Sequence, residues 1–332
     1  MAALSDQLLV ATVLLYVAAM AGFTAEFAFG RTGAVARVAA RQSVLAGGPT
    51  IGTEEPDEAA QPAGVAADGG RRPGANRAAA RIGQLAVAAT AAGAATQAAC
   101  LVTRALAARR VPWGNMYEFI VMVSLVGVLV CLGLIIRRPR LRPLALVTTI
   151  VTLPLLALAA MRVYTPAGPL VPALNSYWLK IHVSAAAVAT GFFLCGFVAV
   201  MLFLVRRRYE IGLARGAAPQ GLTTTLGRIV PAADALERVA FRLHAFAMPV
   251  WTFAVIAGAV WAEAAWGRYW GWDPKEVWAF ISWVVYAAYL HARATPSIRP
   301  TTTAWLAVAG WVTMMFNLFA VNLVISGLHS YA

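Results

Sequence analysis

A tryptophan-rich segment is the part of this sequence whose residue types point most clearly to ligand chemistry. Residues 266–283 read WGRYWGWDPKEVWAFISW, which places five tryptophans within eighteen positions. Each buried indole needs a partner for its N–H group, so a generic core rarely contains so many. The segment therefore predicts an aromatic surface that receives a flat ligand.

Four histidines, His182, His244, His291 and His329, could supply metal ligands. Neutral imidazole is a common axial ligand of haem iron, and haem is a flat tetrapyrrole with an apolar body. The two patterns together predict haem held by imidazoles beside aromatic walls. The three cysteines form no Cys-x-x-Cys motif, which excludes a thioredoxin-type oxidoreductase and a c-type cytochrome as the function of the chain itself.

The tryptophan-rich segment also contains a helix start. Asp273 suits the N-cap, Pro274 the first helical position and Glu276 the third position of a capping box. This local role explains the acidic and proline residues but not the tryptophans that precede them. Gly267 and Gly271 lie between those tryptophans, where they allow a close approach of the backbone or unusual dihedral angles.

Cations in the same segment would suit carboxylates such as the propionates of haem. We therefore predict that one set of residues in this segment contacts the cofactor: Trp266, Arg268, Trp270, Trp272, Asp273, Lys275 and Trp278. The alternative is an aromatic belt at a membrane interface, which would account for part of the tryptophan content without any ligand.

The composition indicates which elements hold these residues. The chain has 332 residues, of which 61% are hydrophobic and 12% charged. A soluble domain of this size cannot bury so much apolar surface, so we predict an all-α, polytopic integral membrane protein. The net charge of +13 comes from arginine clusters between apolar runs, as topology signals do, and does not indicate nucleic-acid binding.

Eight apolar runs are long enough to cross a bilayer, and we predict about eight transmembrane helices. They lie near 8–29, 82–106, 117–136, 143–161, 179–205, 244–263, 275–293 and 303–326. We predict that 1–30 holds the first helix, 31–81 a flexible cytoplasmic linker, and 82–332 a membrane domain with its tryptophan-rich segment at 261–283. Residues 231–243 are expected to form a separate amphipathic helix on the membrane surface.

Arginine and lysine are more frequent on one side of this arrangement, which the positive-inside rule makes the cytoplasmic side. Both termini and the tryptophan-rich loop then lie on the outer face, together with His182 and His329, so we predict that these two histidines are axial ligands of haem iron. His291 lies deep in the seventh span and is a third predicted iron ligand, because ionisable groups within spans usually serve a function. His244 is expected to be an interface residue at the inner start of the sixth span.

A second outer segment, VPWGNMYEF at residues 111–119, precedes the third span. Glu118 lies in the first turn of the expected helix, where the helix dipole favours a carboxylate. Its role stays open between an acid that only supports the helix start and a residue that packs the outer loops.

The chain resembles the cytochrome c assembly proteins of the CcsA/ResC family, called CcsB in actinobacteria, within the haem-handling superfamily that has a tryptophan-rich WWD signature. The resemblance rests on the segment 266–283, on NSYWLKIH at 175–182 and on SGLHSYA at 326–332. The motifs NMYE at 115–118 and YLH at 289–291 agree with it. It covers roughly residues 82–332.

The resemblance implies a component of a system II holocytochrome c synthase in a bacterial plasma membrane, with little activity unless a ResB-type partner is present. Haem b would be presented on the outer face, where its vinyl groups form thioether bonds with a Cys-x-x-Cys-His motif of apocytochrome c. His182 and His329 match the external histidines that hold the iron, and His291 matches an intramembrane histidine whose counterpart lies on the partner. No acid–base catalytic set is identified in the chain.

Three alternatives remain open at this point. The chain could be a CcmC-like haem chaperone without synthase activity, a membrane redox subunit with permanent b-type haems, or a scaffold whose tryptophans form only an aromatic belt. A chaperone of that kind is shorter and has fewer spans. A redox subunit needs paired histidines within its spans, and a scaffold would carry no chromophore.

Overall fold

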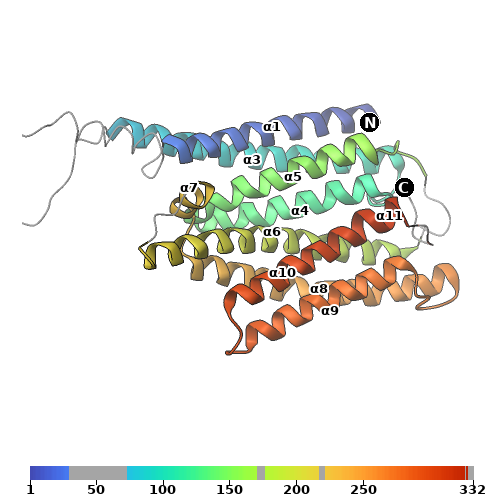
Figure 1. Cartoon of the computed structure of the whole chain (residues 1–332). Coiled ribbons are helices and arrows are strands. Elements are labelled where there is room, and N and C mark those ends of the chain that lie inside the picture. The colour runs from blue at the N-terminus through green and yellow to red at the C-terminus, as the bar shows by residue number, and fades with distance from the viewer. Residues whose placement is uncertain (30–72, 170–175, 217–220, 326, 328–332) are drawn as a thin grey trace, which may run out of the picture.

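The computed structural model describes residues 1–29, 73–169, 176–216, 221–325 and 327. Within these ranges the chain is built from helices and their connections, without strands, as predicted. The long helices run alternately up and down and form one elongated bundle (Figure 1). Helices satisfy their backbone hydrogen bonds internally, which is why a chain this apolar adopts them in a bilayer.

Each of the eight predicted spans corresponds to a long helix. These helices are α1 (Ala2–Phe29), α3 (Pro73–Ala108), α4 (Met116–Arg137), α5 (Arg142–Arg162), α6 (Tyr177–Ala214), α8 (Ala233–Trp266), α9 (Pro274–Ala294) and α10 (Pro300–Met315). Beyond α10 the chain continues through a π-helical turn, η3 (Phe316–Ala320), into α11 (Val321–Leu323). Two short elements, η1 (Pro139–Leu141) and α7 (Leu222–Ile229), lie in the connections.

Seven helical stretches of the described chain are long and apolar enough to cross a membrane, so the protein is a multi-pass membrane protein. The eighth long helix, α9, is not apolar enough to be counted among them. Its tryptophans, tyrosines, His291 and charged ends lower its mean hydropathy. It is nevertheless 21 residues long, which corresponds to about 31 Å at 1.5 Å per residue and matches the thickness of a bilayer core.

Two predicted boundaries were wrong. Helix α3 begins at Pro73, so the end of the predicted linker is helical, while its residues up to 72 lie outside the described residues. Helix α8 begins at Ala233 and runs unbroken to Trp266, so the separate surface helix expected at 231–243 does not form. The short amphipathic helix of this connection is α7 instead.

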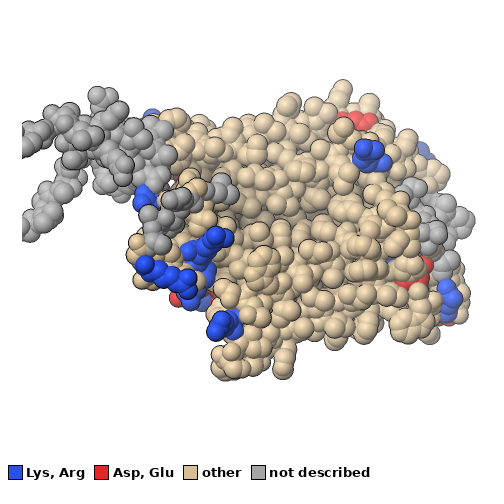
Figure 2. Space-filling view, in the orientation of Figure 1, with Lys and Arg blue, Asp and Glu red and all other residues tan. Residues whose placement is uncertain are grey.

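The two ends of the bundle differ in charge. One end of the bundle contains the start of α1, helix α11 and the α8–α9 connection (Figure 1). The other end contains α7 and the α9–α10 connection. The surface between the ends is almost free of charge, and Lys and Arg gather most densely around α7 (Figure 2). A hollow at that arginine-rich end is lined by Arg207, Arg238 and Arg293. We call the opposite end, which carries the α8–α9 loop, the loop end.

Candidate functional site

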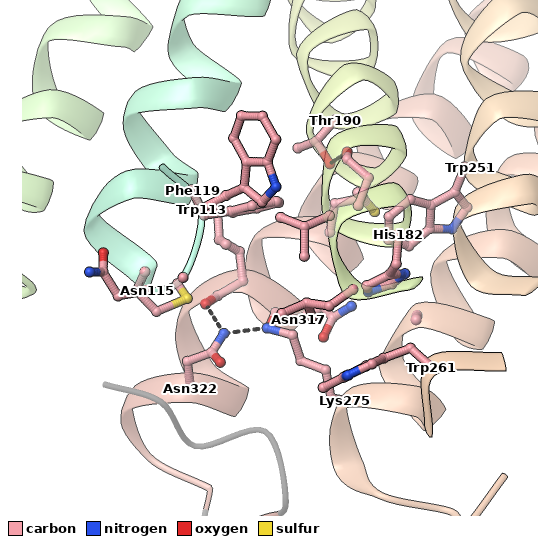
Figure 3. Close-up of a pocket in the computed structure, with 18 residues that line it drawn as sticks. Trp113, Asn115, Phe119, His182, Thr190, Trp251, Trp261, Lys275, Asn317 and Asn322 are labelled. Atoms are coloured by element: carbon pink, nitrogen blue, oxygen red, sulfur yellow. Dashed lines mark hydrogen bonds between the residues drawn. The ribbon is translucent and has the colours of Figure 1, made fainter. Parts of the chain in front are cut away.

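Two adjoining cavities lie at the loop end of the bundle. The larger, which we call the central cavity, has a volume of about 160 Å³ and is bordered by α4, α6, α8, α9 and η3 (Figure 3). The smaller, the loop cavity, has a volume of about 60 Å³ and lies beneath the α8–α9 loop. Both are lined by the same five residues, His182, Trp251, Trp261, Lys275 and Ala279. These residues therefore form a shared wall.

His182 is held in one orientation by α8. Its Nδ1 atom lies 2.7 Å from the carbonyl oxygen of Ala254, and its ring stacks on Trp261 at 6.2 Å with an angle of 14° between the planes. Because a carbonyl only accepts, the proton of the neutral ring lies on Nδ1, and Nε2 keeps its lone pair. A backbone carbonyl behind the ring is the usual support of a metal-binding histidine. Nε2 of His182 is thus the ring atom with a lone pair in the shared wall.

Lys275 places an ammonium group in the cavity wall. Its Nζ atom donates to the carbonyl oxygen of Asn317 at 3.1 Å, and the Asp273 carboxylate acts on it electrostatically. The side-chain oxygen of Asn317 and the indole nitrogen of Trp251 are buried there without hydrogen-bond partners. A cation and unpartnered polar atoms are costly in apolar surroundings. The ammonium and the indole N–H favour a ligand that brings an anionic group, whereas the Asn317 oxygen requires a hydrogen-bond donor.

The π-helical turn explains how Asn317 reaches this position. In a π-turn the backbone bond spans five residues, as seen for the N–H of Val321 and the carbonyl oxygen of Phe316. The turn widens the helix locally, so that Asn317 lines the cavity and its carbonyl oxygen accepts from Lys275. Single π-turns of this kind are frequent at functional sites.

The loop between α8 and α9 has the predicted capping box. The Asp273 side chain accepts from the backbone N–H of Lys275 at 3.0 Å, and Glu276 accepts from the N–H groups of Asp273 at 3.1 Å and Gly271 at 2.8 Å. Gly267 ends α8 with φ of +71°, the left-handed conformation that glycine adopts at little cost. The loop is therefore fixed at both ends by its own backbone chemistry.

The predicted contact residues of this loop divide into two groups. Lys275 and Trp270 line the loop cavity. Trp266 packs against Trp261 at 4.8 Å, and Trp278 packs against Phe316 at 3.9 Å. Neither residue lines the central cavity or the loop cavity.

Arg268 and Trp272 also lie away from both linings. The Arg268 guanidinium lies directly over Gly271, where a Cβ atom would come within 2.3 Å of it. Trp272 is 72% exposed, with its ring edge against Trp270 at 5.9 Å. These two side chains could reach a ligand only from the rim of the loop cavity. Asp273 acts in the cap of α9.

Sequence reasoning missed the aromatic residues that α8 contributes. Trp251 and Trp261 line both cavities, and Gly258 lies between them against the His182 ring. Gly258 and Trp261 follow Trp251 by seven and ten residues, spacings that place all three on one side of an α-helix. This spacing was the signal available in the sequence. Trp113, in the connection before α4, also lines the central cavity.

Trp272 is held in a strained backbone conformation. Its φ of +57° lies in the left-handed region, which costs a bulky residue roughly 1 kcal/mol or more. We expect Trp272→Gly to be more stable than Trp272→Ala by about 1 kcal/mol, because only glycine adopts this conformation freely. Unfolding of both variants in detergent would measure the difference. Equal stability would mean that the loop relaxes and stores no strain.

The other histidines lie far from His182 or outside the described residues. His329 belongs to the latter, although nearby Gly327 lies against the cap of α9, where a Cβ atom would be 2.7 Å from Asp273 Oδ2. His291 is exposed near the arginine-rich end of α9, about 25 Å along the helix from Pro274. The structure therefore separates His182 and His291.

The expectation for His244 was wrong. It is fully buried, with Nδ1 2.7 Å from the carbonyl oxygen of Ala240 and its ring among Phe193, Tyr286 and Tyr289. The reason is the earlier start of α8, which places this residue three turns inside the helix instead of at its beginning.

Comparison with known proteins agrees with this architecture. The family model described as cytochrome C assembly protein matches residues 113–329, from the connection before α4 to the C-terminal region. The chain belongs to this family. Helices α1 and α3 precede the matched part, which contains all residues that line the two cavities.

Three relatives with the name cytochrome c biogenesis protein CcsA illustrate the similarity. The protein of Synechocystis sp. is 33% identical over 71% of this chain and 84% of its own length. That of Microcystis aeruginosa is 34% identical over 70% of this chain and 83% of its own length. That of Guillardia theta is 38% identical over 50% of this chain and 57% of its own length. The tryptophan-rich segment and His182 lie inside the match to the cytochrome c assembly family.

Proposed function

We propose that this chain acts in cytochrome c biogenesis by binding haem b at the loop end and presenting it for thioether attachment to apocytochrome c. The observation that carries the proposal is the shared wall of the two cavities. It combines an imidazole whose Nε2 is free to ligate, two indoles and the amino group of Lys275. Membership of the cytochrome c assembly family supports the same conclusion.

Haem b matches this wall group by group. Its apolar, flat macrocycle suits the indoles of Trp251 and Trp261, which give the cavity wall an aromatic surface. Its iron suits Nε2 of His182, and a propionate suits the ammonium of Lys275, where a charge-assisted hydrogen bond is strong because water is excluded. The ligand would be approached at the edge of the loop cavity by Trp270, Trp272 and Arg268. The helix cap at Asp273 holds Lys275 in place.

His329 is proposed as the second axial ligand, and an apocytochrome histidine would displace one of the two during attachment. His291 is proposed as an iron ligand of a separate site near the cytoplasmic side, completed by a ResB-type partner protein. Its exposure on the outside of α9 supports this assignment, because a ligand shared between two proteins must be accessible from the surface of each. Trp278 and Trp266 support the loop end through aromatic packing.

The proposed topology follows from charge. Arginines gather at the end that carries α7, so this end faces the cytoplasm of a bacterium and the loop end faces outward, with both termini. The haem vinyl groups supply the reactivity toward the Cys-x-x-Cys-His thiols. The chain's own residues position the macrocycle, exclude water from it and hold the iron in an exchangeable ligand pair.

A permanent b-haem redox subunit fits the described residues less well. Such a subunit needs two histidines that face each other inside the spans. The described histidines lie at different depths or on different sides of the bundle, and no ring contact joins two of them. A delivery-only chaperone differs from a synthase component in its product, which the experiment below distinguishes.

The chain purified with a ResB-type partner from haem-replete cells should carry haem b with the spectrum of reduced, bis-histidine iron. Co-expression with an apocytochrome that has a Cys-x-x-Cys-His motif should yield covalently bound haem, which resists extraction by acidic solvent. The chain alone should yield almost none. Bound haem without any covalent product would favour delivery only, and a wild-type complex without haem would disprove the proposal.

A further inference from the structure

Glu118 forms a buried ion-pair cluster with Arg104 and Arg110, which we call the hub. The hub joins two outer connections of the bundle. Its carboxylate accepts from Arg104 Nε at 2.7 Å, from Arg110 Nη1 and Nη2 at 2.7 and 3.1 Å, and from the backbone N–H of Gly114 at 2.8 Å. The Glu118 and Arg104 side chains are 0% and 1% exposed, and that of Arg110 is 10% exposed. The role left open by the sequence is therefore resolved in favour of packing the outer loops.

The two arginines extend the hub to a second connection. Arg104 donates to the carbonyl oxygen of Thr165, and Arg110 donates through Nε to that of Gly168 at 2.9 Å. The Arg104 guanidinium also lies over the rings of Tyr117 and Tyr164, at 4.6 and 5.7 Å from their centres. One carboxylate thus ties the connection before α4 to the connection after α5.

The connection before α4 is also one side of the central cavity. Trp113, Gly114, Asn115 and Met116 all line it. Trp113 and Asn115 lie across the cavity from His182 (Figure 3). We call residues 110–116 the rim segment. Gly114 contacts the hub directly, and Asn115 caps α4 by accepting from the N–H of Glu118 at 2.9 Å. The position of the cavity wall therefore depends on the hub.

Fold stability alone does not require such an arrangement. Well-packed apolar residues usually stabilise a core at least as well as buried ions, whose desolvation is costly. What a bidentate arginine pair adds is a fixed geometry, because its parallel hydrogen bonds allow few alternatives. A fixed rim matters where a ligand must be held in one orientation.

We propose that Glu118 is a positioning residue for the ligand of the central cavity: through Arg104 and Arg110 it holds the rim segment at the distance from His182 that retains haem in one orientation. This inference rests on the proposed function, since it takes haem as the ligand. Glu118 itself does not line either cavity and acts only through the rim segment.

Arg110→Gln is the most informative variant, because it releases the rim segment but leaves the Arg104–Glu118 pair intact and neutral. Glu118→Gln keeps the size of the side chain and removes its charge, and Glu118→Asp keeps the charge and should restore part of the effect. Glu26→Gln is the control, because Glu26 forms an ion pair of 2.6 Å with Arg142 at the opposite end of the bundle.

Two measurements on the complex with the ResB-type partner test the proposal. Amide hydrogen exchange in 110–116 and 163–168 should be faster in Arg110→Gln than in wild type and unchanged in Glu26→Gln. Haem should pass to an excess of a haem-binding acceptor about tenfold faster from Arg110→Gln, as expected for a displaced supporting group. Amounts of folded complex would normalise both results.

The outcomes separate this inference from the proposed function. Faster exchange with unchanged haem retention would overturn it and leave the hub with a structural role only, as would unchanged exchange in both segments. A wild-type complex that holds no haem would overturn the proposed function before any variant is compared. Recovery of haem retention in Glu118→Asp but not in Glu118→Gln would support positioning by the charged hub.

Discussion

Replacement of His182 by alanine is expected to lower haem retention at the loop end by about tenfold or more per folded chain, which is at least roughly 1.4 kcal/mol of binding free energy. The imidazole is the only described histidine in the shared wall, and its carbonyl-bound Nδ1 leaves Nε2 for the iron. Removal of the ring leaves the surrounding helices intact, because His182 lies at the edge of a cavity. Optical spectra of the complex purified with its partner would measure the loss.

Added imidazole should restore the low-spin spectrum of His182→Ala, because the free base can occupy the space left by the ring. His291→Ala is the control, since this residue lies near the opposite end of the bundle and faces outward. It should leave the loop-end spectrum unchanged and lower only a signal that requires the partner. A His182→Ala complex with wild-type haem content and spectrum would show that the iron is held elsewhere.

Gly258→Ala is expected to have an effect of similar size without removing any ligand atom. A Cβ atom at this position would lie 2.7 Å from Nδ1 and 2.8 Å from Cε1 of His182, closer than such contacts occur. The imidazole is the movable group, so the fold is retained while the ring turns away from the Ala254 carbonyl oxygen. A shift of the ligating nitrogen by about 1 Å should lower haem retention by roughly tenfold.

Gly133→Ala is the matched control for this substitution. It adds the same methyl group to a glycine of a membrane-spanning helix, at a position with no atom within 4 Å. Its haem content should equal that of wild type, and its helix should be slightly more stable. Imidazole should not rescue Gly258→Ala, because the displaced ring still occupies the site. Normal haem binding by Gly258→Ala would show that Nδ1 support from α8 is not needed.

The helical architecture could be predicted because a bilayer imposes strict lengths. About twenty apolar residues are required to cross it, so each span is visible as a run in the sequence. The helix ends were less predictable. At residues 73–81, alanine is frequent and is the best helix former, so α3 starts well before its apolar run. The same effect extends α8 back to Ala233 and takes His244 into the core.

The structure places the residues predicted for the site in different surroundings. His182, Lys275 and Trp270 line the cavities, as their residue types suggested. Trp278, which was also predicted to contact the ligand, packs on Phe316. Lys275 and Trp278 lie three residues apart at the start of α9, about 60° around the helix axis, so they are neighbours on one face that can still meet different surroundings. Only the position of the neighbouring helices decides which face is lined by a cavity.

Sequence alone determined that this protein is a multi-pass helical membrane protein of the cytochrome c assembly family with an aromatic loop, because hydropathy and motifs are local properties of the chain. Tertiary structure decided how the site is built. The tautomer of His182 depends on a carbonyl in α8, and the ammonium of Lys275 donates to a carbonyl of the π-turn after α10. The rim segment is held by Glu118, which is paired with two arginines. Each of these contacts joins residues from separate helices or loops, and hydrogen-bond geometry between them exists only once the bundle has packed.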